Sequence, residues 1–365
     1  MTERVHFVLP QMTPYYGMEK AAALLMAALV ERHWDVTATV LSGDIPRVAA
    51  GLRLDALEIP RSPVRLVRAV PPLRRGLAHL PDDALIVACG LWAAAPVATA
   101  LVATGRSYIA WEHSVLAPRL QIDKRVAVLL RLVDTPGLRP ARVVAVSEGV
   151  RRAVASRWPG VPASVVPNII EVAPRPPVPA PRPGARQDVR LLTTGAFRPY
   201  KNYRCAVEAM SLLPDRYRLR MAGDGRQFGT IRSLVDRTGL TDRVELLGRL
   251  PAVAPLLADS HLLVHPSLSE TFGFSLVEAA EAGLPVATLG APAIDELVPG
   301  HVPGVMADGL AAADLATAIE SAVGHAWDPG ELAASWRRRR TAFSADSVAE
   351  KWHTVLRSAR SGLPA

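Results

Sequence analysis

The chain contains 365 residues, of which 50% are hydrophobic and 21% carry a charge. This composition excludes an intrinsically disordered chain, and the length suits two domains better than one hydrophobic core. Lysine and arginine number 42 against 34 acidic residues, so the formal net charge is +8 and indicates an anionic partner: nucleic acid, an acidic membrane or a phosphorylated substrate.

Two cysteines, Cys89 and Cys205, are too few for a disulfide framework, and their apolar neighbours do not indicate a metal site. The apolar run within Met1–Gln11 is shorter than the core of a signal peptide. Both observations fit the reducing cytoplasm, so the sequence predicts a cytoplasmic protein.

The first half alternates β-rich apolar runs with helical patterns. The expected strands lie in residues 4–10, 35–41, 84–90, 107–114 and 141–148, and residues 18–34 form an expected helix between the first two. Strands that alternate with helices predict a parallel sheet covered on both faces.

Residues 84–103 are uncharged over a length that could cross a membrane. Gly90 and Pro96 interrupt the run, its first half is β-rich and its second half is mostly alanine. A buried strand, a glycine turn and an alanine-rich helix therefore explain it better than a membrane span.

The proline-rich stretch 172–187 cannot continue a helix or a central strand, so it predicts a semi-rigid linker. After it the alternation resumes, with expected strands in residues 188–196, 217–225, 243–249, 261–267 and 285–290. The predicted fold is α/β, with two Rossmann-like doubly wound domains, 1–171 and 188–345, and a C-terminal helix, 346–365, that packs back on the N-terminal domain.

Glycines follow the expected strands at the edge where open α/β sheets bind ligands. Gly17 follows the first strand, and Gly195, Gly223, Gly225 and Gly248 follow strands of the second half. Each alone is a weak signal, because a glycine after a strand usually marks a turn. Together they predict a binding edge in each domain and a central cleft between the two.

The stretch His265–Ala287, HPSLSETFGFSLVEAAEAGLPVA, is expected to form the end of a strand, a loop and a helix. The helix should begin near Phe274 and Ser275, with Gly273 in the turn before it and Ser275 as its cap. Free N–H groups at that end favour a phosphate or a carboxylate.

Glu270 and Glu278 lie eight residues apart in this stretch. A retaining glycosidase holds its two carboxyl groups about 5 to 5.5 Å apart, whereas eight helical residues rise about 12 Å. The spacing therefore gives no support to a glycosidase pair. On the spacing alone, the favoured reading is that Glu278 and Glu281 are solvated residues of an amphipathic helix.

The same stretch, with APAIDELV after it, resembles the donor-site signature of glycosyltransferase family 4, retaining enzymes of the GT-B fold. The resemblance runs along nearly the whole chain. It includes YGMEKAAALLMAAL, VVAVSEGVRRAV and VVPNII before the proline-rich stretch, and TTGAFRPYKN, MAGDGR and LLGRL after it. The two glutamates with EAGLPVA are the most specific part, and the shared order of the motifs strengthens it.

The resemblance implies roles for residues of the second domain. Glu278 corresponds to the glutamate that binds the nucleotide ribose, Glu270 to the one that contacts the donor sugar, and Lys201 to the lysine that binds the diphosphate. A carboxylate can accept both hydroxyls of a cis-diol, and a lysine stabilises charge on a departing diphosphate. Backbone amides at Gly273, Phe274 and Ser275 would then meet sugar hydroxyls or phosphate.

In the N-terminal domain His113 matches a family histidine near the reaction centre, and Gly17 matches the second glycine of the family's N-terminal loop. The first glycine of that loop is replaced by Tyr16. Ala196 stands where the family commonly has an arginine, and Arg198, two positions on, is a candidate to supply the missing charge.

The implied reaction transfers a sugar from a nucleotide sugar to an acceptor hydroxyl with retention at the anomeric carbon and without a protein nucleophile. The leaving phosphate oxygen takes the acceptor proton, while Lys201, Arg198 and the helix N-terminus stabilise the leaving charge. No Asp-x-Asp motif lies in a suitable loop. We therefore expect no cofactor and no metal.

The acceptor is not identified by the sequence. Arg61 to Leu80 mixes arginines with apolar residues and contains no acid, which suits peripheral contact with an anionic membrane or a charged acceptor. The alternative is a basic solvent-facing segment broken by Pro71 and Pro72. The run Arg337–Arg340 is expected to be a solvated helix face.

Three alternatives to transfer remain. Nucleic-acid binding would use the positive charge, but no recognised binding motif accompanies it, so no nucleic-acid partner is expected. A catalytically silent sugar-nucleotide-binding homologue would account for Tyr16 and Ala196. A sugar-nucleotide epimerase on the same fold would change the donor without an acceptor.

Overall fold

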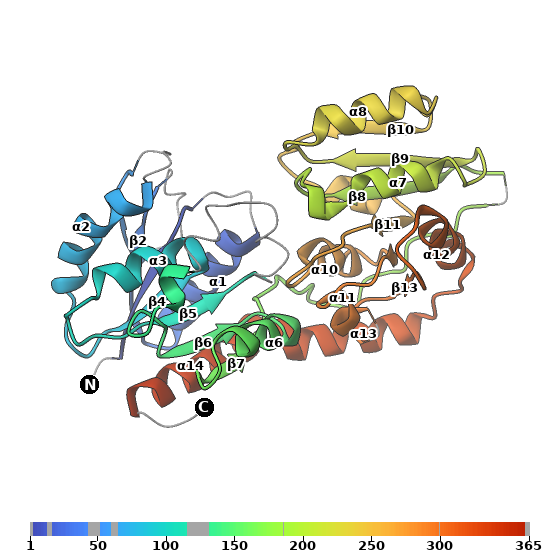
Figure 1. Cartoon of the computed structure of the whole chain (residues 1–365). Helices are drawn as coiled ribbons and strands as arrows, with labels where there is room; N and C mark the ends of the chain where they lie inside the picture. Colours follow the sequence, from blue (N-terminus) through green and yellow to red (C-terminus); the bar gives the residue numbers. More distant parts are fainter. Residues whose placement is uncertain are drawn as a thin grey trace. The chain divides into compact units, whose positions relative to one another are not determined.

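A computed structural model gives the structure of the chain (Figure 1). It describes residues 3–12, 17–42, 52–59, 65–114, 131–184, 186–298 and 300–361, except the side chains of residues 65 and 66. The chain divides into two compact units. Unit 1 comprises Met1–Glu171 and Ala342–Ala365, and unit 2 comprises Val172–Thr341.

Unit 1 contains a sheet in the order β3-β2-β1-β4-β5-β6-β7, and each pair of neighbouring strands is parallel. Its strands are β1 (Arg4–Leu9), β2 (Asp35–Val40), β3 (Arg53–Ala56), β4 (Leu85–Cys89), β5 (Ile109–Glu112), β6 (Arg142–Ala145) and β7 (Ala163–Val165). The central strands β5 and β6 are buried at every position, because helices cover both faces of such a sheet.

Helices of unit 1 connect and cover these strands. They are α1 (Gly17–Glu31), α2 (Arg65–Ala78), α3 (Leu91–Ala100), α6 (Glu148–Arg157) and α14 (Ala345–Ser361). Helix α14, drawn in red in Figure 1, lies at the C-terminal end of the chain and packs on α1, which lies near the N-terminus. The indole of Trp34 donates a hydrogen bond to His353 Nδ1 at 3.0 Å, which fixes this contact.

The expectation for residues 84–103 is confirmed. They form β4, a turn at Gly90 with φ of 71°, and the alanine-rich helix α3. Residues 91–98 are nearly all buried in unit 1, which explains their apolar character. Within the described ranges, no helix combines the length and the apolar character that crossing a membrane requires.

Helix α2 corrects the expectation for Pro71 and Pro72. Both prolines lie inside the helix, so they do not break it. The helix packs along α3 through the buried side chains of Ala69, Leu73 and Leu77, and this apolar contact offsets the hydrogen bonds that the prolines cannot donate. Residues 61–64 of the predicted basic segment lie outside the described residues.

Unit 2 contains a parallel sheet in the order β10-β9-β8-β11-β12-β13. Its strands are β8 (Val189–Thr194), β9 (Tyr217–Ala222), β10 (Val244–Gly248), β11 (Leu262–His265), β12 (Val286–Thr288) and β13 (Gly304–Met306). Buried aliphatic and aromatic side chains of these strands and of the covering helices form its core.

The helices of unit 2 follow its strands in turn. They are η1 (Pro199–Lys201, a 3₁₀ turn), α7 (Tyr203–Met210), α8 (Phe228–Arg237), α9 (Ala254–Ala258), α10 (Phe274–Glu281), α11 (Ile294–Leu297), α12 (Ala312–Gly324) and α13 (Pro329–Phe343). The division between the units falls inside α13, after Thr341.

The proline-rich stretch belongs to unit 2 and contacts α10. The amide of Ala180 donates to Gly283 O at 3.0 Å, and the amide of Ala173 donates to Glu281 Oε2 at 2.7 Å. A Cβ on Gly283 would lie 2.0 Å from Val178 O, so only glycine allows the stretch to approach this closely.

The expectation of a fully solvated face at residues 337–340 is wrong for Arg339. Its side chain is 0% exposed and pairs with Glu281, Nε to Oε1, at 2.5 Å. The guanidinium also donates to the carbonyl oxygens of His301 and Ala280. The reading of Glu281 as a solvated residue is therefore also wrong, because its carboxylate compensates a buried charge.

Candidate functional site

The candidate site of unit 2 lies where the strand order reverses. β8 and β11 are neighbours, yet the chain leaves β8 toward β9 on one side and leaves β11 toward β12 on the other. The loops after these two strands therefore diverge at the carboxyl edge of the sheet, and such a point is where doubly wound folds bind ligands. These loops carry Lys201 and Glu270.

Glycines allow the loops after β8 and β9 to meet backbone to backbone. A Cβ on Gly223 would lie 1.9 Å from Gly195 O, and a Cβ on Gly225 would lie 2.7 Å from Phe197 O. Hydrogen bonds join the same loops, from Gly195 N to Ala222 O and from Phe197 N to Asp224 O, both at 3.0 Å. The glycines thus set the position of the segment that carries Lys201.

Lys201 and Glu270 form an ion pair across the switch point. Nζ of Lys201 lies 2.6 Å from Oε2 of Glu270, and the two side chains are only 14% and 12% exposed. The backbone joins the two loops as well, because the amide of Leu268 donates to Tyr200 O at 2.9 Å. Burying two charges in this way costs desolvation free energy. The presence of the pair despite this cost favours a functional role.

His265 and Ser275 extend the pair into a hydrogen-bonded row. Nε2 of His265 lies 3.0 Å from the same Oε2, and Nδ1 lies 3.2 Å from Ser275 Oγ. A carboxylate only accepts hydrogen bonds, so Nε2 carries the proton, and Nδ1 of the neutral ring accepts from the serine hydroxyl. Oε1 of Glu270 accepts no hydrogen bond from the described residues.

Charges in this row control its protonation. Burial alone would raise the pKa of Glu270, but the Lys201 ammonium and the His265 hydrogen bond outweigh it and hold that pKa well below its usual range. Burial would lower the pKa of Lys201, but Glu270 raises it. Burial lowers the pKa of His265, so at neutral pH the row is a charged lysine, a charged glutamate and a neutral histidine.

Helix α10 begins at Phe274 as predicted, although its cap differs from the expectation. Its N-cap residue is Gly273, with φ of 82°, and no side chain caps this end. The prediction that Ser275 caps the helix is wrong, because its hydroxyl hydrogen-bonds His265. The first intrahelical bonds are donated by Leu276 and Val277, which leaves the amides of residues 273–275 without intrahelical acceptors.

Other predicted residues of unit 2 lie around this row. The rings of Phe274 and Phe272 meet edge to face at a centroid distance of 4.9 Å, and a Cβ on Gly273 would lie 3.0 Å from Leu297 Cδ1. Glu278 is half-buried one helical turn after Ser275. Arg198 is half-buried directly before η1, and its guanidinium makes no ion pair with the part of the chain that the structure describes.

His113 and Gly17 lie in unit 1. His113 follows β5 at the carboxyl edge of its sheet, and burial lowers its pKa to about 3. Its Nε2 is buried and has no hydrogen-bond partner among the described residues. Gly17 is the first residue of α1, and Tyr16 lies outside the described residues.

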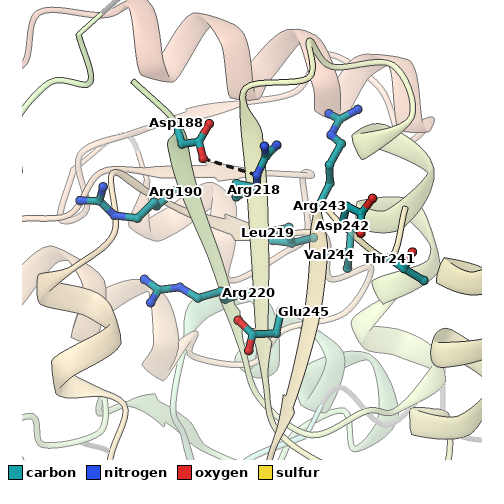
Figure 2. Close-up of a pocket in the computed structure, with 10 residues that line it drawn as sticks. All are labelled: Asp188, Arg190, Arg218, Leu219, Arg220, Thr241, Asp242, Arg243, Val244 and Glu245. Carbon is teal, nitrogen blue, oxygen red and sulfur yellow. Dashed lines mark ion pairs between the residues drawn. The ribbon is translucent and has the colours of Figure 1, made fainter. Parts of the chain in front are cut away.

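A cavity of about 350 Å³ opens at the opposite end of the unit 2 sheet. Figure 2 shows residues that line it, at the amino-terminal ends of β8, β9 and β10. Its arginines are paired with carboxylates: Arg218 with Asp188 at 3.5 Å and Arg220 with Asp259 at 3.0 Å. The cavity is therefore distinct from the candidate site, because its arginines are paired and it lies at the opposite end of the strands from Lys201.

Metal ligands do not cluster in the described ranges, where no group of three or more His, Cys, Asp or Glu side chains could hold an ion.

One member of the row, His265, was not predicted from the sequence. His265 ends a strand, and a lone histidine there carries no signal of its own. Its spacing of five residues before Glu270 becomes informative only when the loop is known to fold back.

Residues 188–325 match the family model described as Glycosyl transferases group 1. The sequence is 32% identical over 145 residues to 2-deoxystreptamine glucosyltransferase of Streptomyces kanamyceticus, covering 38% of this chain and 37% of that protein. It is 37% identical over 97 residues to N-acetyl-alpha-D-glucosaminyl L-malate synthase of Bacillus anthracis, covering 26% of each chain. The matches thus span well under half the length of these relatives.

Solved structures are similar over the whole chain. Sucrose-phosphate synthase from Thermosynechococcus elongatus matches with a TM-score of 0.80 at 18% sequence identity, and the match covers 99% of this chain and 100% of that chain. HepE from Anabaena, solved with UDP and glucose, matches with a TM-score of 0.75, 18% identity, 98% of this chain and 100% of that chain. The expected fold class, α/β of the GT-B type with two Rossmann-like domains, is confirmed.

Proposed function

We propose that the protein is a retaining glycosyltransferase that moves a sugar from a nucleotide sugar to an acceptor hydroxyl. The observation that carries the proposal is the buried Lys201 to Glu270 pair at 2.6 Å, at the strand switch point and beside the N-terminus of α10. A cation, a carboxylate and free helix amides in one place match the three parts of such a donor: diphosphate, sugar hydroxyls and developing negative charge.

Each residue then has a role. Lys201 binds the diphosphate and stabilises the charge that grows as the nucleoside diphosphate leaves. Arg198 is the second cation, and it replaces the charge that Ala196 lacks. These cationic side chains take the place of a divalent ion, and the amides of residues 273–275 add hydrogen bonds to the donor.

Two carboxylates select the donor. Glu270 accepts hydrogen bonds from the sugar through Oε1, which has no partner among the described residues. Glu278 accepts both ribose hydroxyls from its position on α10. His113 of unit 1, whose buried Nε2 has no hydrogen-bond partner among the described residues, is the further residue that we propose to act on the donor sugar.

The reaction proceeds on one face of the sugar. As the bond between the anomeric carbon and the phosphate oxygen breaks, the acceptor oxygen bonds to the same face of that carbon, and the phosphate oxygen takes its proton. The configuration is therefore retained, and no covalent bond to the protein forms.

The relatives guide the choice of donor. One relative is named a 2-deoxystreptamine glucosyltransferase and another an N-acetyl-alpha-D-glucosaminyl L-malate synthase, and HepE was solved with UDP-glucose as well as with UDP and glucose. We therefore propose a UDP-linked glucose or N-acetylglucosamine as the first donors to test. We also propose peripheral contact with an anionic membrane, because α2 carries exposed arginines.

A thermal-shift screen of the purified protein against UDP-, GDP-, ADP- and dTDP-sugars tests this function. We expect one nucleotide series to raise the melting temperature, and Glu278→Ala to abolish the rise, because ligands that bind only the folded state stabilise it. No stabilisation by any series, with the protein folded, would reject the proposal.

A second candidate function is that of a silent sugar-nucleotide-binding homologue, because the half-buried Ala196 lacks the charge of an arginine. Donor hydrolysis or transfer separates the two. A donor that raises the melting temperature but is neither hydrolysed nor transferred would identify the silent homologue, and conversion of its sugar without an acceptor would identify an epimerase.

A further inference from the structure

Glu270 accepts two hydrogen bonds on a single oxygen. Lys201 Nζ lies 2.6 Å and His265 Nε2 lies 3.0 Å from Oε2. If Lys201 binds the diphosphate of a donor, the ammonium must share its hydrogen bonds with phosphate oxygens, whose negative charge competes with the carboxylate. His265 is then the remaining donor to Glu270 among the described side chains.

We propose that His265 is a positioning residue that holds the Glu270 carboxylate in place for the donor sugar while Lys201 turns to the diphosphate. This inference rests on the function proposed above. It adds a residue that touches neither sugar nor phosphate and acts only through Glu270.

The backbone makes His265 a rigid support. It is the last residue of β11, and its carbonyl oxygen accepts hydrogen bonds from Thr288 Oγ1 at 2.8 Å and from the amide of Leu289 at 3.3 Å. Its side chain is 4% exposed, so the ring has little room to move. A ring fixed at a strand end loses less conformational entropy on making its hydrogen bond than a side chain on a loop.

Ser275 fixes which nitrogen of the ring carries the proton. Its hydroxyl, 3.2 Å from Nδ1, can donate to that nitrogen and thereby leaves the N–H on Nε2, toward Glu270. The hydroxyl comes from the first turn of α10, the helix end proposed to meet the donor. The direction of the histidine hydrogen bond is thus linked to the structure of the binding edge.

The loop of Glu270 depends on few other contacts. Ser267 Oγ lies 3.3 Å from Tyr200 O and 3.0 Å from Ser269 O, and both bonds hold the start of the loop. Neither reaches the carboxylate. Without His265, the carboxylate would keep only the lysine that the diphosphate also attracts.

Two substitutions at this position test the proposal. His265→Leu keeps the approximate volume but donates no hydrogen bond, whereas His265→Gln places an amide N–H near the position of Nε2. Arg218→Gln, at the edge of the distant cavity, serves as the matched control, because its guanidinium pairs with Asp188 and lies outside the proposed machinery.

The first measurement is calorimetric titration with UDP and with UDP-N-acetylglucosamine, or with the pair that the thermal-shift screen selects. We expect His265→Leu to bind the nucleoside diphosphate within about 3-fold of the unaltered protein but to lose about 10-fold or more in the affinity that the sugar adds. His265→Gln should recover most of that loss. Equal losses for both ligands, or no loss for either, would overturn the proposal.

The second measurement is the pH profile of donor hydrolysis or transfer. Because a hydrogen bond to a carboxylate favours its charged form, removing His265 raises the pKa of Glu270. The acid limb of kcat, which reports the donor-bound enzyme in which Lys201 has turned to the diphosphate, should move to higher pH in His265→Leu and return toward its original position in His265→Gln. A limb that stays in place in both variants would contradict the proposal, even where His265→Leu lowers the melting temperature.

Failure of this inference is distinguishable from failure of the proposed function. If the unaltered protein binds no nucleoside diphosphate, the function itself is wrong and the inference falls with it. If the unaltered protein binds and turns over its donor while both His265 variants match the Arg218→Gln control, only the role of His265 is wrong.

Discussion

The carboxyl edges of the two sheets are built in different ways. In unit 2 the edge holds a row of paired side chains, from Lys201 through Glu270 and His265 to Ser275, and glycine loops that contact each other through the backbone. In unit 1 the corresponding edge presents His113, whose buried Nε2 has no partner among the described residues.

The charged groups at the unit 2 edge are therefore paired before a ligand binds, whereas Nε2 of His113 at the unit 1 edge has no partner among the described residues. A preformed row suits a ligand of constant chemistry, such as the nucleotide part of a donor. An unpartnered nitrogen suits a group that arrives with the substrate, because a buried polar atom without a partner costs free energy until it is satisfied.

Lys201→Ala should have the largest effect. Removing the cation that faces the leaving charge is expected to lower kcat/KM by about 10² to 10³. The same change leaves Glu270 nearly buried and without its cation, which should destabilise unit 2 by about 3 kcal/mol, the low end for buried pairs because both side chains keep some exposure. Steady-state kinetics and thermal unfolding measure the two effects.

The control for this variant is Lys351→Ala, which removes an exposed lysine of α14. It should change neither quantity measurably, because exposed charges contribute little. If Lys201→Ala behaved like Lys351→Ala, the preformed edge of unit 2 would have no role in the reaction.

Acid should destabilise unit 1 through His6. This side chain is 4% exposed, and burial lowers its pKa from 6.5 to about 4. A histidine that stays neutral when folded but takes up a proton when unfolded contributes stability that is complete above pH 6.5 and is lost as the pH falls toward 4. The loss approaches about 3 kcal/mol at 1.4 kcal/mol per pH unit.

Thermal unfolding at pH 7.5 and pH 4.5 checks this expectation. In His6→Asn the loss between the two pH values should be smaller by about 2 kcal/mol, because the variant side chain does not titrate. An identical loss in both proteins would show that other groups cause the acid sensitivity.

Two glutamates on α10 should separate binding from stability. Glu278→Ala is expected to weaken nucleoside diphosphate binding by about 10- to 100-fold, the value of hydrogen bonds to a charged acceptor, and to lower the melting temperature less than Glu281→Ala does. Glu281→Ala should lower the melting temperature instead, because it leaves the fully buried Arg339 without its carboxylate. Calorimetric titration and thermal unfolding of both variants provide the comparison.

The opposite pattern, with Glu281→Ala impairing binding in a protein of unchanged stability, would contradict the assignment of roles along α10. Equal effects of both variants on binding would show that the helix acts through its overall stability.

His113→Ala should lower kcat by about 10-fold and leave the affinity for the nucleoside diphosphate unchanged. The reason is that His113 belongs to unit 1 and is proposed to contact only the sugar. Kinetics and calorimetry on the same preparation measure both quantities. A loss of nucleoside diphosphate affinity would remove the distinction between the two edges.

The smallest effect concerns the basic helix α2. Arg68 and Arg75 are exposed, whereas Arg74 donates to the carbonyl oxygen of Ala100 at the end of α3. Replacing Arg68 and Arg75 by Gln should weaken binding to vesicles with 30% anionic lipid by about 1 kcal/mol for each charge. A sedimentation assay that shows no binding by the unaltered protein would reject the membrane contact.

The sequence predicts much of unit 2 because its signals are local. A run of apolar residues, a glycine in the turn and good helix formers after it place β11, Gly273 and α10 correctly. The Ser275 cap was predicted wrongly for the same reason, since a serine near a helix start is a local signal and its actual partner, His265, lies ten residues earlier.

Tertiary contacts account for the remaining differences. The sequence gives no sign that Arg339, within a run of four arginines, would be buried against Glu281 58 residues earlier. Pro71 and Pro72 indicate a break, yet the packing of α2 on α3 keeps the helix intact. Both outcomes depend on which surfaces meet in the fold, and such contacts are not encoded in any short stretch.

The most direct test of the central claim is the configuration of the first sugar released. The protein is incubated with a UDP-α-linked sugar labelled with ¹³C at the anomeric carbon, and the product is followed by NMR before mutarotation. Retaining transfer predicts that the α-anomer appears first and that Lys201→Ala abolishes its formation. First appearance of the β-anomer, or formation at an equal rate in Lys201→Ala, would contradict the account.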